Sequence, residues 1–125
     1  MLEGKSPVVY GDGQQSRDFT FVANVVQANL LAGTVTGIGG RLFNVANGAA
    51  TSLLTLIDEL NRLLGTSIAA DHEPPRAGDV RDSMADISLA RRDLGYDPRI
   101  EFREGLERSI EYYRWLVGRR QQQRR

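Results

Sequence analysis

The sequence has 125 residues, 41% hydrophobic and 26% charged, which suits one small folded domain and is too short for two. Sixteen basic and sixteen acidic side chains cancel, which argues against a nucleic-acid-binding protein that acts through overall charge. The sequence contains no cysteine, which excludes disulfides and thiolate metal sites, and no apolar run near the roughly 20 residues of a membrane span. Residues 1–7 do not resemble a signal peptide, so we expect a cytoplasmic protein with no membrane partner.

The first third of the chain predicts two extended segments followed by a helix. Residues 8–10 read as a short strand that ends in a turn at residues 11–13 (GDG). Residues 17–22 are rich in aromatic and β-branched side chains, which favours a second extended segment. Residues 22–32 show helical spacing, and Gly33 stands where a C-cap glycine is expected. The apolar positions that share one face of this helix are Val22, Val25, Val26 and Leu30.

A glycine-rich connector at residues 37–40 separates this helix from a predicted strand at residues 41–46 (RLFNVA). Residues 47–48 (NG) read as a turn. The clearest helix follows, with Ser52 as its N-cap and Gly65 at its end. Its apolar side is lined by Leu53, Ile57, Leu60 and Leu64.

The third quarter of the chain predicts a strand, a loop and a short helix. Residues 68–73 favour a strand, and residues 74–81 form a loop with two prolines and a glycine. Asp86 is positioned to cap a short helix that ends at Gly95. The apolar face of that helix consists of Ile87, Ala90 and Leu94. Residues 99–102 read as a brief extended piece.

The last predicted element is an amphipathic helix closed by Gly118. Its buried side is expected to consist of Leu106, Ile110, Tyr113 and Val117. Residues 119–125 (RRQQQRR) have nothing to bury and are expected to be a disordered basic tail. The predicted fold is therefore mixed α/β (α+β), with one domain over residues 1–118 and strands too short for a self-sufficient doubly wound sheet.

Common catalytic and cofactor motifs are weak or missing. Dinucleotide binding needs a strand, G-x-G-x-x-G and a helix, but residues 11–13 lack the third glycine and residues 37–40 precede a predicted strand. There is no G-x-S-x-G nucleophile motif. The one histidine, His72, lies between Asp71 and Glu73, and without a recognisable ligand spacing it favours an exposed residue over a metal site.

Two segments of the sequence, taken together, indicate a protein family. They are residues 8–28 (VVYGDGQQSRDFTFVANVVQA) and residues 75–96 (PRAGDVRDSMADISLARRDLGY). With residues 43–48 (FNVANG) between them and residues 104–106 (EGL) in the last helix, they resemble the C-terminal region of the NAD-dependent epimerase/dehydratase family of extended short-chain dehydrogenases/reductases. The resemblance spans about residues 4–115 and is strongest to UDP-glucose and UDP-N-acetylglucosamine 4-epimerases. It implies a small C-terminal substrate domain without the Rossmann domain, and UDP or a UDP-sugar as ligand.

The resemblance also implies roles for residues in the first segment. Arg17 matches the family arginine that reaches the diphosphate of the sugar nucleotide, and a guanidinium suits this task because it offers paired donors to phosphate oxygens. The alternative is a strand-end arginine paired with Asp18. Val8 and Tyr10 match the strand whose backbone reads the uracil, although Tyr10 is equally compatible with simple packing.

In the second segment, the resemblance implies that Arg76 binds phosphate and Asp79 accepts hydrogen bonds from ribose hydroxyls. Gly78 between them would permit a positive φ or a close backbone approach. The alternative is a surface loop with an internal Arg–Asp ion pair of little energetic value. Arg81 is expected at most to support the loop.

The family's catalytic groups, a Tyr-x-x-x-Lys pair and a Ser or Thr, have no match here, because no tyrosine is followed by lysine four residues later. We therefore expect a partial enzyme with no catalytic residue of its own: NAD belongs to the complete enzyme and none to this chain alone. Expected partners are a missing Rossmann half or further copies of the chain, contacted partly through the leucine face of the Ser52 helix and the cluster of Tyr112, Tyr113 and Trp115. A dehydratase fragment, a non-enzymatic nucleotide-binding module and a structural or oligomerising remnant remain alternatives.

Overall fold

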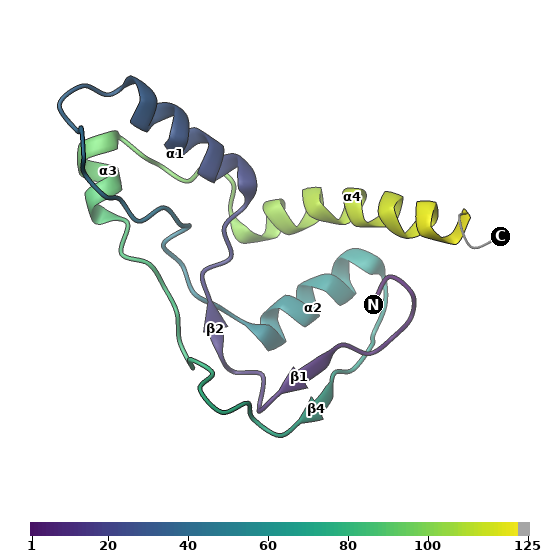
Figure 1. Cartoon of the computed structure of the whole chain (residues 1–125). Helices are drawn as coiled ribbons and strands as arrows, with labels where there is room; N and C mark the ends of the chain where they lie inside the picture. The colour runs from purple at the N-terminus through teal and green to yellow at the C-terminus, as the bar shows by residue number, and fades with distance from the viewer. Residues whose placement is uncertain (123–125) are drawn as a thin grey trace.

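The computed structural model describes residues 1–122 of the chain (Figure 1). In chain order the strands are β1 (Val8–Tyr10), β2 (Ser16–Arg17), β3 (Thr51–Ser52) and β4 (Asp71–Glu73). The helices are α1 (Val22–Thr34), α2 (Leu53–Leu64), α3 (Ser88–Leu94) and α4 (Phe102–Gln122). The chain is therefore mixed α and β with short strands, which confirms the predicted fold class. Among the helices described, none combines the length and the apolar character needed to cross a membrane.

Within residues 1–122 the strands pair two by two. β1 runs parallel to β4 in a register that places Val8 opposite Asp71 and Tyr10 opposite Glu73. β2 pairs antiparallel with β3. Because parallel strands end at the same edge of a sheet, the turn after β1 and the loop after β4 emerge side by side. The Gly11 amide joins them by donating to the Glu73 carbonyl at 2.8 Å.

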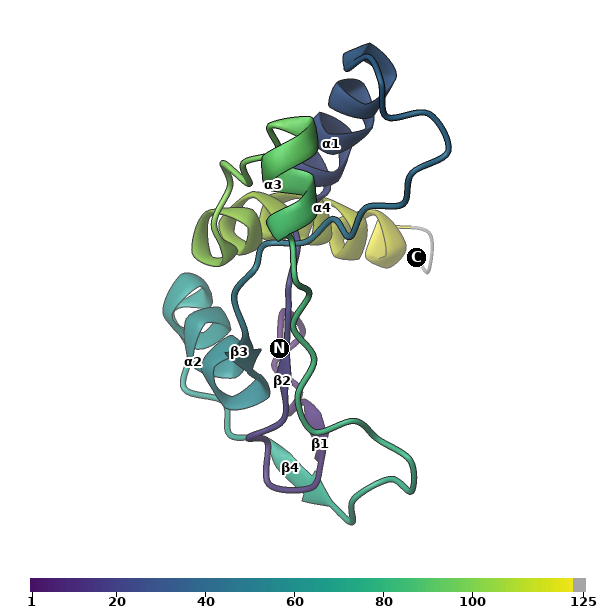
Figure 2. The same cartoon turned by 90° about the vertical axis from the view of Figure 1, so that its left-hand side faces the viewer.

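The elements form two groups joined by extended segments, with α4 between them (Figures 1 and 2). One group contains α1 and α3, and the other contains α2 with β1 and β4. The main apolar core lies in the first group and consists of Ala28, Ala46, Ile87, Ala90, Leu94 and Tyr96. Tyr96 is 1% exposed, and its hydroxyl donates to the Ala46 carbonyl at 2.8 Å, so its one polar atom is satisfied.

Both capping residues predicted for α2 are confirmed, as is Gly95 at the end of α3. The Ser52 hydroxyl accepts a hydrogen bond from the Thr55 amide at 3.1 Å, and Gly65 ends α2 with a φ of 66°. The N-cap of α3 is Ile87 rather than the predicted Asp86, which lies one residue earlier and whose carboxylate accepts from the Ser88 amide. Gly95 ends the helix in the same left-handed conformation as Gly65. Ile87, Ala90 and Leu94 are buried, as predicted.

Residues 41–46 do not form the predicted strand in the part of the chain that the structure describes. Phe43 and Val45 pack against the core, whereas Leu42 is 90% exposed. The alternation typical of a strand is thus present, but no partner strand lies alongside among the described residues. A strand depends on such a non-local partner, which the local sequence does not specify.

Two predicted helix ends are wrong. α1 continues through Gly33 to Thr34, and α4 continues through Gly118 to Gln122. Neither glycine adopts the left-handed backbone of a C-cap, so each acts as an ordinary helical residue. Tyr113, expected on the buried side of α4, is 52% exposed. The predicted tail thus begins inside a helix, and its residues 123–125 lie outside the described part.

Helix α1 presents its apolar side outward. Val22 is 65% and Leu30 66% exposed, and Val25 and Val26 on the same face are exposed as well. The side chains that α1 buries are Asn24 and Ala28. The Asn24 side chain holds α1 to the segment before α4. Its Nδ2 donates to the Ile100 carbonyl at 2.7 Å, and its Oδ1 accepts from the Ile100 backbone amide at 3.1 Å.

Candidate functional site

The edge of β1 that faces away from β4 lies open to the candidate site. The Pro7 carbonyl and the Gly11 amide bond toward β4. Because peptide groups alternate in direction along a strand, those of Val8 and Tyr10 point to the opposite edge. There the Gln15 side chain reaches the Tyr10 carbonyl at 2.7 Å. The strand predicted to read a base through its backbone therefore has the backbone groups of Val8 and Tyr10 on its unpaired edge.

Two adjoining hollows of about 240 and 320 Å³ lie beside this edge. They share four lining residues, contributed by β1, the turn after it and the loop after β4: Tyr10, Gln15, Arg76 and Asp79. We refer to the two hollows together as the cleft. The cleft brings together residues of both sequence segments singled out above.

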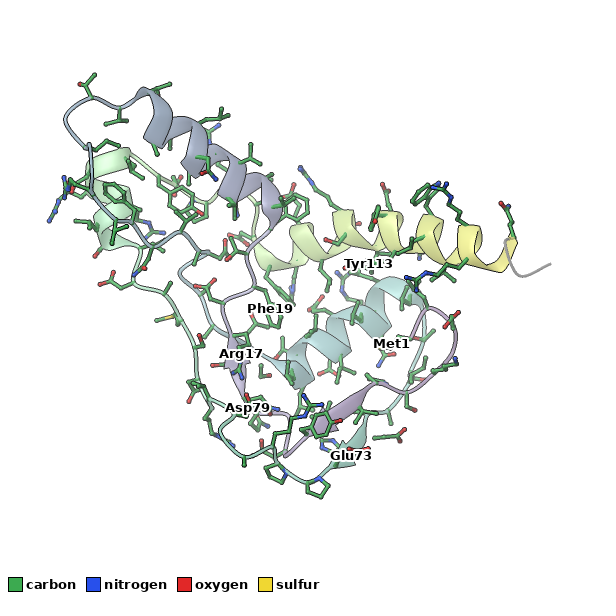
Figure 3. The ribbon with its side chains drawn as sticks, viewed as in Figure 1. Met1, Arg17, Phe19, Glu73, Asp79 and Tyr113 are labelled. Carbon is green, nitrogen blue, oxygen red and sulfur yellow. The ribbon has the colours of Figure 1, made fainter. Side chains whose placement is uncertain are left out.

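Arg17 lies at the border of the cleft and pairs with Asp79. The Arg17 Nη2 atom is 2.7 Å from Asp79 Oδ1, and Figure 3 shows the two side chains side by side. Nη1 donates to the carbonyls of Ser16, at 2.7 Å, and Arg81, at 3.3 Å. The guanidinium is therefore oriented by three acceptors, and about a third of the Arg17 side chain remains exposed. Among the described residues Arg17 therefore pairs with Asp79 and not with Asp18, and the exposed loop shows no internal Arg–Asp ion pair.

Asp18 has a structural role. Its carboxylate accepts hydrogen bonds from the amides of Asn47 and Gly48, both at 2.9 Å. Gly48 adopts a φ of 72°, as the predicted turn requires. Asp18 thus ties the start of α1 to the segment that precedes α2 and leaves its neighbour Arg17 to the cleft.

Arg76 stacks on Tyr10. The guanidinium carbon of Arg76 lies 3.6 Å from the centroid of the Tyr10 ring, close enough for a cation–π interaction. The loop turns sharply here, because the Asp79 amide donates to the Arg76 carbonyl at 3.3 Å and Gly78 has a φ of 81°. The positive φ predicted for Gly78 is confirmed. Among the ion pairs of the described residues, Arg76 has no carboxylate partner, so its charge is available to an anion.

Sequence reasoning missed the contributions of Asp12 and Gln15 and gave Arg81 at most a supporting role in the loop. Arg81 donates to both carboxylate oxygens of Asp12, at 3.3 and 3.0 Å. The Gln14 amide and the Arg81 guanidinium lower the pKa of Asp12, and Asp12 in turn raises the pKa of Arg81. Gln15 is 8% exposed and lines both hollows. The available signal was an acidic residue between two glycines, which is typical of a turn.

The cleft therefore carries three guanidinium groups against two carboxylates, together with an unpaired strand edge. This is the chemistry of a site for an anion that bears a planar polar group: arginines bind phosphate oxygens, and backbone groups pair with a base. The chemistry depends on contacts between distant segments rather than on one local motif.

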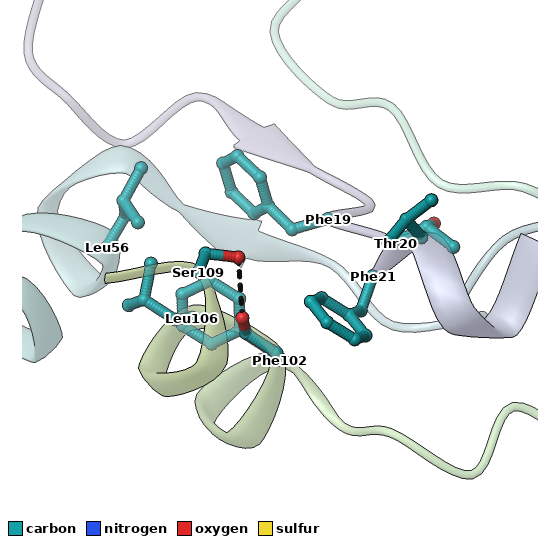
Figure 4. A pocket seen from close by; sticks show the side chains of 9 residues that line it. Phe19, Thr20, Phe21, Leu56, Phe102, Leu106 and Ser109 are labelled. Carbon is teal, nitrogen blue, oxygen red and sulfur yellow. Dashed lines mark hydrogen bonds between the residues drawn. The ribbon is translucent and has the colours of Figure 1, made fainter. Parts of the chain in front are cut away.

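A third hollow, of about 250 Å³, lies apart from the cleft and has a different character (Figure 4). It lies between the start of α1, helix α2 and helix α4, and no charged residue lines it. Phe19, Phe21 and Phe102 form much of its wall, and the Ser109 hydroxyl is occupied by the Gly105 carbonyl at 2.7 Å. Its lining has no cationic side chain to hold a phosphate.

Residues 1–122 show neither a cluster of metal ligands nor a glycine cluster that opens a helix. Among residues 1–122 no three His, Cys, Asp or Glu side chains lie close enough to hold a metal ion, and His72 contacts the Gly11 carbonyl at 2.7 Å. The glycines at 11–13 lead into β2, and those at 37–40 lead into an extended segment. Neither cluster opens a helix whose N-terminus would face a pyrophosphate.

Residues 1–109 match the model of the family described as GDP-mannose 4,6 dehydratase. The chain is 37% identical to a UDP-glucose 4-epimerase of Mycolicibacterium smegmatis over 114 residues, which cover 91% of this chain and 36% of that protein. It is 35% identical to a putative UDP-glucose 4-epimerase of Methanocaldococcus jannaschii, covering 90% of this chain and 35% of the relative. The chain thus spans little more than a third of the length of these relatives.

Solved structures of 4-epimerases also match most of this chain and little more than a third of their own length. A Thermotoga maritima UDP-glucose 4-epimerase with UDP-glucose matches 94% of this chain and 37% of its own, with a TM-score of 0.85 and 36% identity. A Bacillus cereus UDP-glucuronic acid 4-epimerase in complex with UDP-glucuronic acid and NAD matches 93% and 37%, with a TM-score of 0.87 and 31% identity. The family resemblance read from the two segments is confirmed.

Proposed function

Because the chain belongs to the NAD-dependent epimerase/dehydratase family, we propose that it forms the UDP-sugar-binding region of a UDP-sugar 4-epimerase. The observation that carries the proposal is the meeting of Arg17 and Arg76 with Asp79 beside the open edge of β1. In this proposal Arg17 and Arg76, 59 residues apart in sequence, bind the same anion. The binding unit so defined takes in residues 1–118.

In this proposal each cleft residue has a specific task. Arg17 and Arg76 bind the diphosphate, because each presents several donors to phosphate oxygens. Asp79 uses the carboxylate oxygen that Arg17 leaves free to accept from the ribose hydroxyls. The backbone groups of Val8 and Tyr10 pair with the uracil, which requires no particular side chain at either position.

NAD supplies the hydride chemistry of a complete epimerase, and its binding groups lie outside the residues described here. What this chain contributes is a firm hold on the nucleotide and few contacts to the hexose. Such a division suits 4-epimerisation, since the sugar must present both faces to the same hydride carrier while its nucleotide stays bound. We propose no catalytic residue for the chain.

The family-model description favours a second candidate, the nucleotide-binding region of a 4,6-dehydratase. The anchoring chemistry would be the same, since a dehydratase also holds its substrate by the diphosphate. The two candidates differ in the product formed and in the base preferred. Stronger binding of GDP than of UDP would favour the dehydratase reading, because the named dehydratase acts on a GDP-sugar.

Reconstitution tests the proposal. The chain would be combined with the N-terminal two-thirds of the M. smegmatis relative and assayed with UDP-glucose. We expect UDP-galactose to form, with Arg17→Ala abolishing most of the activity and Arg62→Ala, on the surface of α2, leaving it intact. If the N-terminal part folds and binds NAD but no epimer forms with the wild-type chain, the enzymatic proposal fails and a nucleotide-binding module remains.

A further inference from the structure

The loop that carries Arg76 and Asp79 has no hydrophobic anchor. Every residue from 71 to 84 is exposed, although the segment lines one wall of the cleft. A segment that buries no apolar side chain keeps its place only through polar contacts and backbone pairing, and it loses conformational entropy by doing so. The contacts that hold the loop therefore decide how well the cleft is formed.

Four contacts between side chains cross from the loop to β1, its turn and β2. Two of them, Arg17 with Asp79 and Arg76 with the Tyr10 ring, involve groups that the proposed function assigns to the nucleotide. A bound nucleotide competes for those groups, so neither contact can be relied on to hold the loop in the complex. The other two contacts are the hydrogen bond of Ser16 Oγ to Asp82 Oδ1, at 2.7 Å, and the ion pair of Arg81 with Asp12, which uses both oxygens of the carboxylate.

The Arg81–Asp12 pair is itself well anchored. The Asp12 carboxylate also accepts from the Gln14 amide at 2.9 Å, which fixes its orientation in the turn. The Arg81 carbonyl accepts from the Ser16 amide at 2.9 Å and from the Arg17 guanidinium at 3.3 Å. Arg81 thus contacts the turn after β1 with its side chain and the proposed phosphate-binding arginine with its backbone.

We propose that Arg81 and Asp12 form a positioning clasp that holds the loop over the cleft and keeps Arg17, Arg76 and Asp79 in place for the nucleotide. This inference rests on the proposed function and adds two residues to it. Neither residue needs to touch the ligand. Exposed ion pairs contribute little each, so the expected loss of UDP affinity on breaking the clasp is modest, up to about fivefold.

Hydrogen exchange of the loop amides tests the clasp without any ligand. We expect Asp12→Asn and Arg81→Gln to speed exchange at Asp79 and Ser83 while the melting temperature stays close to that of the wild type. Arg62→Gln, which removes an ion pair on α2, is the matched control and should leave these amides unchanged. Unchanged exchange in both clasp variants would overturn the proposal.

Calorimetry with UDP separates positioning from direct binding. If the two residues act as a clasp, each single variant weakens UDP binding to a similar extent, the double variant adds little, and the charge-swapped pair Asp12→Arg with Arg81→Asp restores affinity. If Arg81 instead binds phosphate itself, Asp12→Asn frees it and binding stays equal or tightens, which refutes the clasp. A wild-type chain that binds no UDP would refute the proposed function, whereas intact exchange protection in the variants refutes only the clasp.

Discussion

Arg17 and Asp79 form an ion pair of 2.7 Å across 62 residues of sequence. The pair joins β2 to the exposed loop after β4 and places a guanidinium and a carboxylate at one border of the cleft. Because the two residues lie in different segments and meet only in the fold, neither segment alone could identify the site. An exposed ion pair contributes little to the free energy of folding, so its importance lies in the orientation that it gives to the N–H donors of Arg17.

Arg17→Lys tests whether the fork of the guanidinium matters. A lysine keeps the charge but loses the planar set of donors that now contacts Asp79 and two carbonyls. We expect UDP affinity to fall by about tenfold, as measured by calorimetry, with little change in melting temperature. Arg62→Lys on α2 serves as the control for a general effect of the substitution. Equal affinity of Arg17→Lys and the wild type would show that charge alone suffices.

Asn24→Ala tests the junction between α1 and α4. Asn24 is 1% exposed, and its side chain satisfies both the amide and the carbonyl of Ile100. Removal leaves the amide and the carbonyl of Ile100 without these partners in a partly buried place, which should lower the free energy of unfolding by about 2 kcal/mol. Urea denaturation measures the change. Asn29→Ala, an exposed residue of the same helix, should change it by less than about 0.5 kcal/mol.

Gly13→Ala tests the turn that presents Asp12. Gly13 has a φ of 77°, and a Cβ there would lie 2.6 Å from the Leu54 side chain, so strain and overlap add together. We expect a loss of more than about 1 kcal/mol in unfolding free energy. Gly33→Ala in α1 meets no atom within 4 Å and should stabilise the helix by roughly 0.5–1 kcal/mol. Opposite signs in thermal or urea denaturation distinguish the two sites.

Asp93 gives the fold a defined acid sensitivity. The Arg92 guanidinium, helped by Arg41, lowers the pKa of Asp93 from its ordinary 3.8 to about 2. A carboxyl with a depressed pKa stabilises the fold fully above its unfolded pKa, and this stabilisation is lost as pH falls through the folded pKa. We therefore expect Asp93→Asn to reduce the drop in melting temperature between about pH 4 and pH 2. An identical drop in the variant and the wild type would contradict this assignment.

Features encoded locally could be predicted from the sequence. The α2 helix follows from its leucine spacing, the Ser52 cap and Gly65, all within one segment, and the structure has the same bounds. The turn at Gly78 likewise follows from the preference of glycine for a positive φ. The site residues could be named only through a family resemblance, because Arg17 and Asp79 lie too far apart for any pattern to join them.

Features that depend on a partner could not be predicted. Residues 41–46 have the composition of a strand, yet pairing requires a second strand that the local sequence does not specify. The exposed apolar face of α1 has the same origin, since helical spacing shows that Val22 and Leu30 share a face but not what covers it. Arg81 was expected to support the loop, but its pairing with Asp12 was not predicted, because that pairing depends on the path of an exposed loop.

Calorimetric titration of the chain with UDP, repeated on Arg17→Ala and Arg76→Ala, tests the account most directly. We predict saturable binding to the wild-type chain that each substitution largely removes, because both guanidinium groups are assigned to the diphosphate. Circular dichroism of the variants checks that they remain folded. No heat of binding from a folded wild-type chain at millimolar UDP, or undiminished binding by both variants, would contradict the assignment of the cleft as the nucleotide site.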